Sequence, residues 1–367
     1  MDSERRPRLT PPIADIRRAV RESLSALAAA GPATPAPATN PVDAAPPGAW
    51  QIALPVAVAE AANRPLVLVA LSGGPDSLAL AAATAFEASR LGLRAGAVIV
   101  DHGLQEGSAS VAATASVQAS SLGLDPVIIS TITVGDSRDN GGPEAAARTA
   151  RYAALEHEAS RLGAVAILLG HTLDDQAETV LLGLARGSGA TSLHGMLRSS
   201  GRYLRPMLAI RRAATEQFCA DSGLTPWNDP QNLDPEFTRV RVRTRVLPML
   251  EAELGPGIAE ALARTADALR EDSDALDHFA EEVAEELADH AEAGISLPVR
   301  ALASNPAALR QRLIRLAVQS EFHLSLSRAS TLEVARLVTD WHGQGPLHLP
   351  GVRVERQGGL LVFTASA

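Results

Sequence analysis

The chain contains no lysine, because all 33 of its basic residues are arginine. The common phosphate-binding loop of nucleotide-binding proteins requires a lysine after its glycines, so that loop is excluded. Cysteine is almost absent too, with Cys219 as its one occurrence. A disulfide within the chain and a four-cysteine zinc or iron–sulfur site are therefore excluded. A single cysteine is compatible with a protein of a reducing compartment.

Long apolar segments are also missing. No apolar run reaches the roughly 18 residues that a membrane span needs, and residues 1–8 lack the apolar core of a secretory signal. The 367 residues are 46% apolar and 20% charged. We therefore expect a soluble, cytoplasmic protein of two domains with no membrane partner.

Charge is distributed unevenly around a net value of −9. Residues 186–248 contain ten arginines and five acidic residues, whereas residues 249–296 contain fourteen acidic residues and two arginines. The basic segment fits a polyanionic partner such as a nucleic acid. A solvated, arginine-rich surface is the competing interpretation.

The order of apolar and polar segments predicts an α/β fold. Apolar residues at three- and four-residue steps predict a helix over residues 12–29. A Pro/Ala-rich stretch at 31–48 reads as a disordered insert, and 51–63 as a short helix. Strands and helices then alternate, which predicts a Rossmann-like parallel sheet with helices on both faces. The predicted strands are 66–71, 95–101, 126–132 and 165–170, and the predicted helices are 75–91, 108–122, 143–162 and 174–186.

The most informative motif is Ser72–Ser77, which reads Ser-Gly-Gly-Pro-Asp-Ser and follows the apolar run Leu66–Leu71. Glycines let the backbone approach a ligand closely, and the N–H groups at a helix start attract an anion. Asp76 would repel a phosphate unless Mg²⁺ lies between them. An ordinary strand–turn–helix corner is the alternative.

Polar residues also follow two other predicted strands. Asp101-His102 ends the second, and Gly170-His171 ends the fourth and leads into Asp175 and Glu178. In a parallel α/β sheet, ligands bind beyond the carboxyl ends of the strands. Asp175 and Glu178 lie three residues apart and share a helix face. Two carboxylates there suit Mg²⁺ or an ammonium group. The plainer interpretation is a simple helix cap, with Asp174 as the N-cap and Glu178 in the first helical turn.

Several motifs together resemble the tRNA(Ile)-lysidine synthetase family of PP-loop ATP pyrophosphatases. The resemblance runs from about Leu66 to Leu250. It departs from the family pattern at Val240, where Asn is frequent, and at Gln231, where Ser or Thr is usual. Its motifs are the loop at 72–77, Asp101–Leu104, Glu144–Tyr152, Gly170–Thr179, Arg186–Gly189 with Ser192–Met196, Arg205–Leu208, Asp229–Asn232, Thr238–Arg243 and Leu247–Leu250.

The resemblance implies an adenine nucleotide α hydrolase-like fold and a two-step ligase reaction. The wobble cytidine of a CAU-anticodon tRNA(Ile) is adenylated by ATP with Mg²⁺, and free L-lysine then displaces AMP. It implies catalytic roles for Asp76, Arg148, Asp175 and Glu178, with the lysine held by Asp175 and Glu178. The implied Mg²⁺ ligands are Asp76 and Asp175. The implied ATP site is Ser72, Gly73, Gly74, Pro75, Asp76, Ser77, Asp101, His102, Gly170 and His171. The implied tRNA contacts are Arg205, Arg239, Arg241 and Arg243, although Arg241 and its neighbours at steps of two could equally be one exposed face of a strand or loop.

Other functions stay open at this point. Another adenylating enzyme of the same superfamily, such as an ammonia-using NAD⁺ or GMP synthetase, shares the loop. A tRNA cytidine thiolase would need paired cysteines, and Cys219 is alone. A non-catalytic ATP sensor has no need for the pair Asp175 and Glu178. A homodimer is compatible with all of these functions.

The last third of the chain changes character. We expect domains at 1–50, 51–250 and 251–367, the last comprising a helical linker and a small α+β module that contacts tRNA or acts as a structural cap. Residues 254–293 predict one long acidic helix, and Gly358-Gly359 predicts a hairpin turn. Its histidines show no metal-ligand spacing. Further helices are expected at 305–320 and 328–340, and strands at 347–349, 352–355 and 360–363.

Overall fold

The computed structural model describes most of the chain, which divides into two compact units, residues 1–265 and 266–367. No helix among the described residues is long and apolar enough to cross a membrane. The described residues are 9–29, 64–101, 103, 107–132, 143–187, 190–287, 289–291 and 294–366. The predicted insert at 31–48, the predicted helix at 51–63, His102, Leu104, Ser188 and Gly189 lie outside them.

The first unit is built on a six-stranded sheet with the order β3-β2-β1-β4-β6-β5. Neighbouring strands from β3 to β6 run parallel, and the short β5 pairs antiparallel with β6. The predicted Rossmann-like α/β fold is confirmed. The strands are β1 (Leu66–Ala70), β2 (Arg94–Asp101), β3 (Val127–Thr131), β4 (Ala164–Leu168), β5 (Ser199–Ser200) and β6 (Tyr203–Leu204).

The chain moves outward from β1 to β2 and β3, and then returns to place β4 on the other side of β1. This reversal makes the carboxyl ends of β1 and β4 the topological switch point, where doubly wound sheets bind their ligands. The helices that follow these two strands are α3 (Pro75–Arg90) and α6 (Leu173–Arg186).

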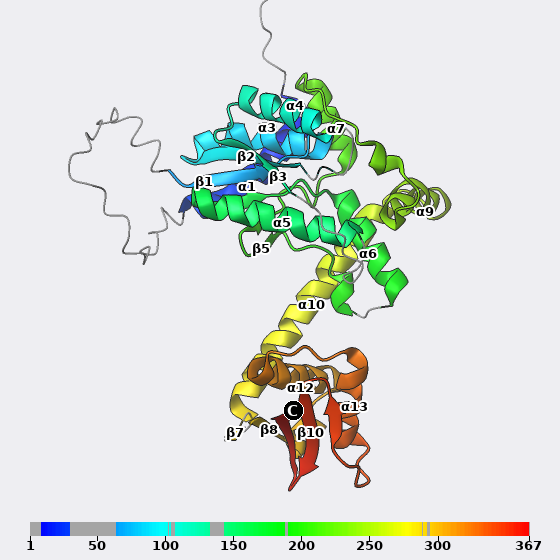
Figure 1. Cartoon of the computed structure of the whole chain (residues 1–367). Coiled ribbons are helices and arrows are strands. Elements are labelled where there is room, and N and C mark those ends of the chain that lie inside the picture. Colours follow the sequence, from blue (N-terminus) through cyan, green and yellow to red (C-terminus); the bar gives the residue numbers. More distant parts are fainter. Residues whose placement is uncertain are drawn as a thin grey trace, which may run out of the picture. The chain divides into compact units, whose positions relative to one another are not determined.

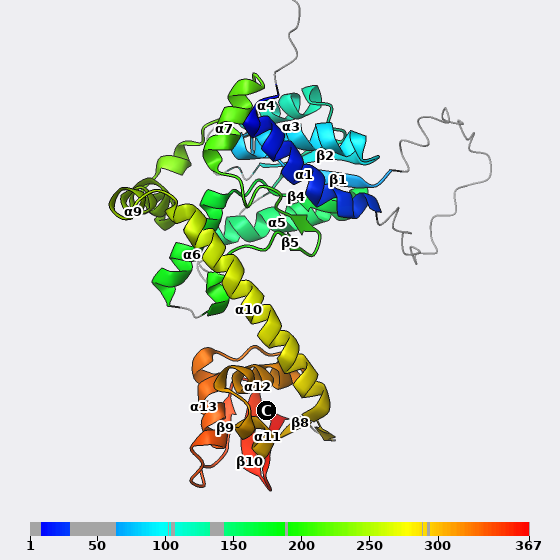
Figure 2. The ribbon, with the colours of Figure 1, turned by 180° about the vertical axis from the view of Figure 1, so that it is seen from behind.

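Helices cover both faces of this sheet, as Figure 1 and Figure 2 show. Alternate residues of β1 point to opposite faces, so Val67 and Val69 join one buried cluster and Leu66 and Leu68 another. The first cluster includes α1 (Pro11–Ala29), α3, α4 (Ser108–Ser121) and α7 (Arg212–Asp221), and the second includes α5 (Pro143–Leu162).

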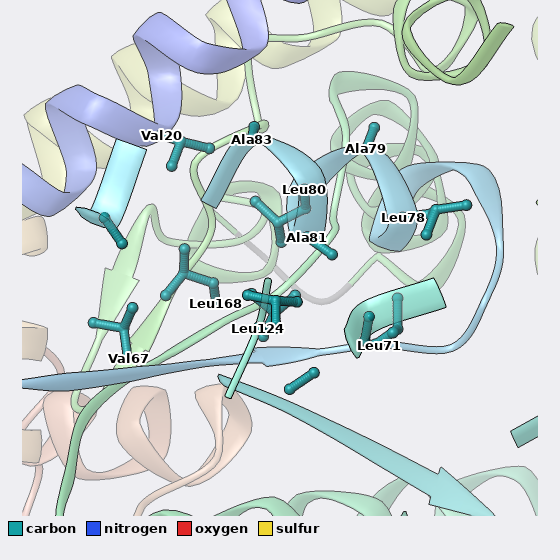
Figure 3. Packing of buried hydrophobic residues seen from close by; sticks show 14 of the residues in the cluster. Val20, Val67, Leu71, Leu78, Ala79, Leu80, Ala81, Ala83, Leu124 and Leu168 are labelled. Atoms are coloured by element: carbon teal, nitrogen blue, oxygen red, sulfur yellow. The ribbon is translucent and has the colours of Figure 1, made fainter. Parts of the chain in front are cut away.

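Helix α1 is part of the first unit's core. Its apolar stripe (Ile13, Ile16, Val20 and Leu24) is almost fully buried, and each such side chain contributes about 1.5–3 kcal/mol when removed from water. Figure 3 shows Val20 on one side of the α3 residues Leu78–Ala83, with Val67 and Leu168 of the sheet on the other. Helix α1 thus supports the helix that follows the Ser72–Ser77 loop.

Residues 238–254 form a continuous helical segment. It consists of α8 (Thr238–Arg241), a π-helical turn (Val242–Val246) and α9 (Leu247–Leu254). The alternative interpretation of residues 239–243 as one face of a strand or loop is wrong. Val240, Val242 and Leu247 are buried, and the five-residue step from Val242 to Leu247 matches the i to i+5 spacing of the π-helical turn.

The second unit contains a five-stranded antiparallel sheet with the order β7-β8-β11-β10-β9. The predicted helices and C-terminal strands are confirmed as α12, α13, β9, β10 and β11, with Gly358 and Gly359 between β10 and β11. The elements are β7 (Asp289–Ala291), β8 (Gly294–Pro298), α11 (Val299–Ser304), α12 (Ala307–Phe322), α13 (Arg328–Thr339), β9 (Leu347–Leu349), β10 (Val352–Gln357) and β11 (Leu360–Ala365).

The long acidic helix is shorter than predicted. Helix α10 runs from Ile258 to Leu287, and β7 lies where the sequence predicted more helix, with β8 directly after the predicted end of the helix. Strand β8 buries Ile295 and Leu297 because it pairs with β11, about 65 residues further along the chain. Phe279, in the second half of α10, is 52% exposed.

Candidate active site

The Ser72–Ser77 loop joins β1 to α3 and presents its backbone at the switch point. Gly73 has φ of +85°, a conformation that L side chains rarely adopt. Ser77 Oγ accepts a hydrogen bond from the Ser72 N–H at 3.2 Å and donates to the Gly74 carbonyl at 3.1 Å. No side chain caps the start of α3 at Gly74, so its first N–H groups are available to an anion.

Two further segments lie against this loop. A Cβ atom added to Gly170, after β4, would lie 3.1 Å from the Ser77 nitrogen, so the chain packs there only without a side chain. The Trp227 N–H donates to the Gly73 carbonyl at 2.9 Å. The loop is therefore fixed from both sides, which leaves its backbone preorganised for a ligand.

Helix α6 begins with a capping box. The Asp175 Oδ2 atom accepts hydrogen bonds from both the N–H and the hydroxyl of Thr172 at 2.8 Å, and the Asp175 N–H donates back to the Thr172 hydroxyl at 3.4 Å. The N-cap is thus Thr172, rather than Asp174 as in the simple helix-cap interpretation. Asp175 and Glu178 are both buried on the face directed at the loop.

Three carboxylates meet one guanidinium at the switch point. Arg212, the first residue of α7, donates from Nε to Asp76 Oδ2 at 3.0 Å and from Nη2 to Asp175 Oδ1 at 2.9 Å. Its Nη1 atom lies 3.5 Å from Glu178 Oε1. Asp76 also accepts a hydrogen bond from the Thr215 hydroxyl, one turn further along α7. The loop and the acidic pair are therefore joined through α7.

Two more arginines pair with Glu178. Arg239 Nε donates to Glu178 Oε2 at 2.8 Å, and Arg243 Nε donates to Glu178 Oε1 at 2.7 Å. Arg243 also reaches Asp175 Oδ1 at 3.3 Å. Glu178 is fully buried, and these guanidinium groups supply the charge that such a carboxylate needs.

The environment shifts the pKa values of these groups in different directions. Burial raises the pKa of Asp76, against the opposing effect of Arg212. Burial acts the same way on Asp175, but Arg212, the Thr172 N–H and Arg239 outweigh it and lower the pKa of Asp175 to about 2. The carboxylates of Asp175 and Asp76 in turn raise the pKa of Arg212, against the effect of its burial.

His171 follows β4 and is neutral at pH 7, because burial lowers its pKa to about 4. Its Nδ1 atom is buried and has no hydrogen-bond partner. Arg205 and Arg239 lower the pKa further, while Asp175 opposes them. A neutral imidazole can accept or donate a hydrogen bond to a bound ligand without adding charge.

A pocket of about 230 Å³ lies beside the carboxylates. Its polar walls include Glu178, Arg212 and Arg243, together with Asp174 and Arg211. This volume is below the roughly 300–1,000 Å³ of sites for drug-sized ligands. A small, charged molecule of amino-acid size suits it better than a nucleotide does.

The remaining predicted site residues lie in different settings. Asp101, buried at the end of β2, accepts a hydrogen bond from the Gly103 N–H at 3.0 Å. Arg148 is exposed on α5, with its guanidinium 5.0 Å from the Tyr152 ring centroid. Arg205 is buried and donates to the Leu197 carbonyl at 2.8 Å. Arg241 is half-buried and donates to the carbonyls of residues 235 and 236 at 2.7 Å.

Sequence reasoning did not single out Arg212 or Thr215. Both follow the Arg205–Leu208 motif closely, and Arg212 is one of the ten arginines of the basic segment. The sequence feature that could have identified Arg212 and Thr215 is their position at the start of a helix, just after the Arg205–Leu208 motif. The carboxylates that they contact come from α3 and α6.

Comparisons with known proteins agree with this geometry. A model described as a PP-loop domain matches residues 51–250, and one described as a TilS substrate binding domain matches residues 297–361. The tRNA(Ile)-lysidine synthase of Leifsonia xyli is 62% identical over 85% of this chain and 96% of its own length. The chain belongs to the tRNA(Ile)-lysidine synthase family.

Other relatives extend the same result. The family members of Thermobifida fusca and Streptomyces coelicolor are 53% and 52% identical, each over 82% of this chain and over 92% and 86% of their own lengths. The U34-tRNA thiolase NcsA from Methanococcus maripaludis, solved with its [4Fe-4S] cluster, is 18% identical with a TM-score of 0.50. The similarity covers 71% of this chain and 80% of the thiolase chain, and it is evidence for the fold but not for the function. The predicted family and fold are confirmed, and the PP-loop domain is that of ATP-using enzymes.

Proposed function

We propose that this chain joins free L-lysine to carbon 2 of the wobble cytidine in a CAU-anticodon tRNA(Ile), using ATP and releasing AMP and pyrophosphate in the cytoplasm. The observation that carries the proposal is the placement of the Ser72–Ser77 loop, Asp175 and Glu178 at one switch point in a chain 62% identical to a named family member. The lysine-linked cytidine would then pair with adenosine in place of guanosine.

ATP binding falls to the loop and the start of α3. The uncapped N–H groups there, with the Ser72 and Ser77 hydroxyls, suit the pyrophosphate part of ATP. Adenylation places the cytidine oxygen in line with the departing pyrophosphate, so positioning and charge stabilisation matter more than a protein nucleophile.

The carboxylates also suit Mg²⁺. Asp76 and Asp175 offer hard oxygen donors, and Mg²⁺ typically takes one or two carboxylates together with substrate phosphates. Among the described residues, no group of three or more His, Cys, Asp or Glu could hold a metal ion, so the site depends on phosphate oxygens of the substrate as further ligands. When bound, Mg²⁺ neutralises charge on the phosphates, and Asp76 and Asp175 are the residues that we assign to hold it.

Lysine binding falls to Asp175 and Glu178, with the adjoining pocket for the rest of the molecule. The walls of the pocket carry carboxylates, such as Glu178, as well as guanidinium groups, such as Arg212. The carboxylates suit the α-amino group of a free amino acid, and the guanidinium groups suit its α-carboxyl group. The ε-amine has an ordinary pKa near 10.4, so it must lose a proton before it attacks the adenylated cytidine. A carboxylate next to the ammonium group can hold it in place and help to remove that proton.

For tRNA, the exposed Arg148 and the half-buried Arg241 are the candidates whose settings best suit phosphate contacts, because neither pairs with Glu178. Arg205 is buried, and Arg239 and Arg243 pair with Glu178, so these three contribute more naturally within the crevice. The match of residues 297–361 to a substrate-binding domain model supports a tRNA contact by the second unit.

The test is the transfer of radiolabelled lysine to transcribed CAU-anticodon isoleucine tRNA in the presence of ATP and Mg²⁺. We expect one label per tRNA and equal amounts of AMP, with no label on a tRNA whose wobble cytidine is changed to uridine. ATP cleavage with another acceptor, and no lysine transfer, would replace the substrate while keeping the nucleotide site. ATP binding without cleavage under any condition would favour a sensor.

A further inference from the structure

One arginine bridges all of the carboxylates assigned to cation binding. The guanidinium of Arg212 lies within 3.0 Å of Asp76 and 2.9 Å of Asp175, and 3.5 Å from Glu178. Its planar group has donors on several edges, so one side chain can bind carboxylates from different directions. No other residue among those described contacts all three.

The backbone holds Arg212 in this position. Its N–H donates to Asp174 Oδ2 at 2.7 Å, which fixes the start of α7 against the start of α6. Arg211 pairs with the same Asp174 and with Glu260 at 2.7 Å. The side chain of Arg212 retains 18% exposure and lines the 230 Å³ pocket, so it has open space beside it.

The three carboxylates differ in how much they depend on Arg212. Glu178 keeps Arg239 and Arg243 as partners if Arg212 leaves. Asp175 keeps Arg243 at 3.3 Å and its hydrogen bonds from Thr172. Asp76 has Arg212 as its one ion-pair partner among the described residues. The Asp76 side chain is 20% exposed, and a largely buried carboxylate without a cation nearby costs free energy, so Asp76 favours either Arg212 or a replacement cation.

We propose that Arg212 is a resident counter-cation that occupies the site of Asp76 and Asp175, and that an incoming cation binds only by displacing it. The inference rests on the proposed function in one respect, the assignment of Asp76 and Asp175 as Mg²⁺ ligands. Arg212 offsets the negative charge of these carboxylates and holds them in position before the ligand arrives. In return, it lowers the affinity of the site for Mg²⁺ and for the lysine ammonium group.

The test measures direct binding of Mn²⁺ to the full chain in the absence of nucleotide, lysine and tRNA. The free ion is quantified by electron paramagnetic resonance. Arg212→Gln removes the guanidinium, and Arg211→Gln is the matched control. Arg211 carries the same charge, lines the same pocket and contacts Asp174 and Glu260 rather than the three carboxylates. We expect Arg212→Gln to bind Mn²⁺ about tenfold more tightly, the effect of removing one adjacent charge. Arg211→Gln is expected to stay within about twofold of the wild type.

Two further variants complete the test. Arg212→Lys keeps the charge but loses the planar fork, so its Mn²⁺ affinity should fall between those of the wild type and Arg212→Gln. Adding Asp76→Asn to Arg212→Gln should abolish the gain. If Arg212→Gln does not fold, as judged by circular dichroism, Arg212→Lys still gives the direction of the change.

Equal or weaker Mn²⁺ binding by folded Arg212→Gln or Arg212→Lys would overturn the proposal, because a displaced competitor must leave a tighter site. An equal gain in Arg211→Gln would also overturn it, since the effect would then be one of general charge. The measurement involves no tRNA or lysine, so it stands apart from the lysine-transfer assay. Failure of that assay with tighter Mn²⁺ binding in Arg212→Gln would reject the substrate and keep the role of Arg212.

Discussion

The two compact units bury their polar side chains in very different ways. Among the described residues, the second unit buries only Ser273, Ser296 and Thr331 besides its apolar core, whereas the first buries six charged side chains. Burying charge rarely adds stability, so these side chains require a reason. The six are Glu87, Asp101, Glu158, Asp175, Glu178 and Arg205.

Not every buried charge in the first unit marks a site. Glu87 pairs with Arg21 of α1, and Glu158 pairs with Arg161 on its own helix, so each has a local structural explanation. Asp175 and Glu178 differ because they share Arg212 with the loop residue Asp76 at the ends of β1 and β4. The comparison shows that a site is identified by where several charges converge rather than by the burial of any one charge.

The largest expected effect is on the stability of the second unit. Phe363 is fully buried in its apolar cluster, and Phe363→Ala should lower the free energy of unfolding by about 3–5 kcal/mol. ATP binding to the first unit should be unchanged, because each unit has its own core. Hydrogen exchange of both units and calorimetric ATP titration check this. A loss of protection throughout the first unit would contradict the expectation that each unit is stabilised by its own core.

A comparably large effect is expected on catalysis from Asp76→Asn. The change keeps the shape of the side chain but removes the charge next to the phosphate loop. Pyrophosphate release should fall about 10²–10³-fold, the range for removing a preorganised electrostatic group. The thermal midpoint gives the control, since the chain should stay folded. Activity near that of the wild type would remove Asp76 from the proposed site.

A smaller effect concerns pH and His171. Its pKa is lowered to about 4, so the folded state favours the neutral ring. The stability that follows is present above the ordinary pKa near 6.5 and is lost as pH falls toward 4. Allowing for partial exposure, we expect a loss of about 2 kcal/mol over this window. Urea titrations between pH 7 and 4 measure it, and His171→Gln should flatten the curve there relative to the wild type. Equal slopes for the two proteins would contradict the assignment.

The smallest effect is expected at the surface of the first unit. Arg241→Gln should weaken tRNA binding a few-fold and reduce the slope of log affinity against log salt by about one. Arg18→Gln is the control, since Arg18 is exposed and pairs only with Asp15 among the described residues. Filter binding at several salt concentrations separates the two. An unchanged slope for Arg241→Gln would restrict Arg241 to its hydrogen bonds with residues 235, 236 and 238.

The parts that the sequence predicted correctly carry local signals. The apolar run before Ser72 predicts β1, and the reversal of strand order places the motifs after β1 and β4 beside one another. The helices and strands of the second unit follow their own periodicity. Each of these strands and helices depends on residues close together in the chain, and the rule that parallel sheets bind ligands at the carboxyl ends of their strands brings the distant motifs together.

The parts that the sequence did not reveal depend on distant partners. Arg212 lies 136 residues from Asp76, and no local pattern links them. Arg239, Arg241 and Arg243 alternate at steps of two, as in a strand, but the chain there is helical. Arg239 and Arg243 are four residues apart on one helix face and both reach Glu178, while Arg241 points elsewhere. Strand β8 likewise needs β11 to form.

The proposed transfer of lysine to the wobble cytidine is tested most directly by mass spectrometry. The mass of the wobble nucleoside in CAU-anticodon tRNA(Ile) is measured after incubation with this chain, ATP, Mg²⁺ and lysine. We expect a cytidine heavier by one lysine less one water, at the wobble position alone, and about 10²–10³-fold less of this product in the same time with Asp76→Asn. An unmodified wobble cytidine alongside full ATP cleavage, or a modification at another nucleotide, would contradict it.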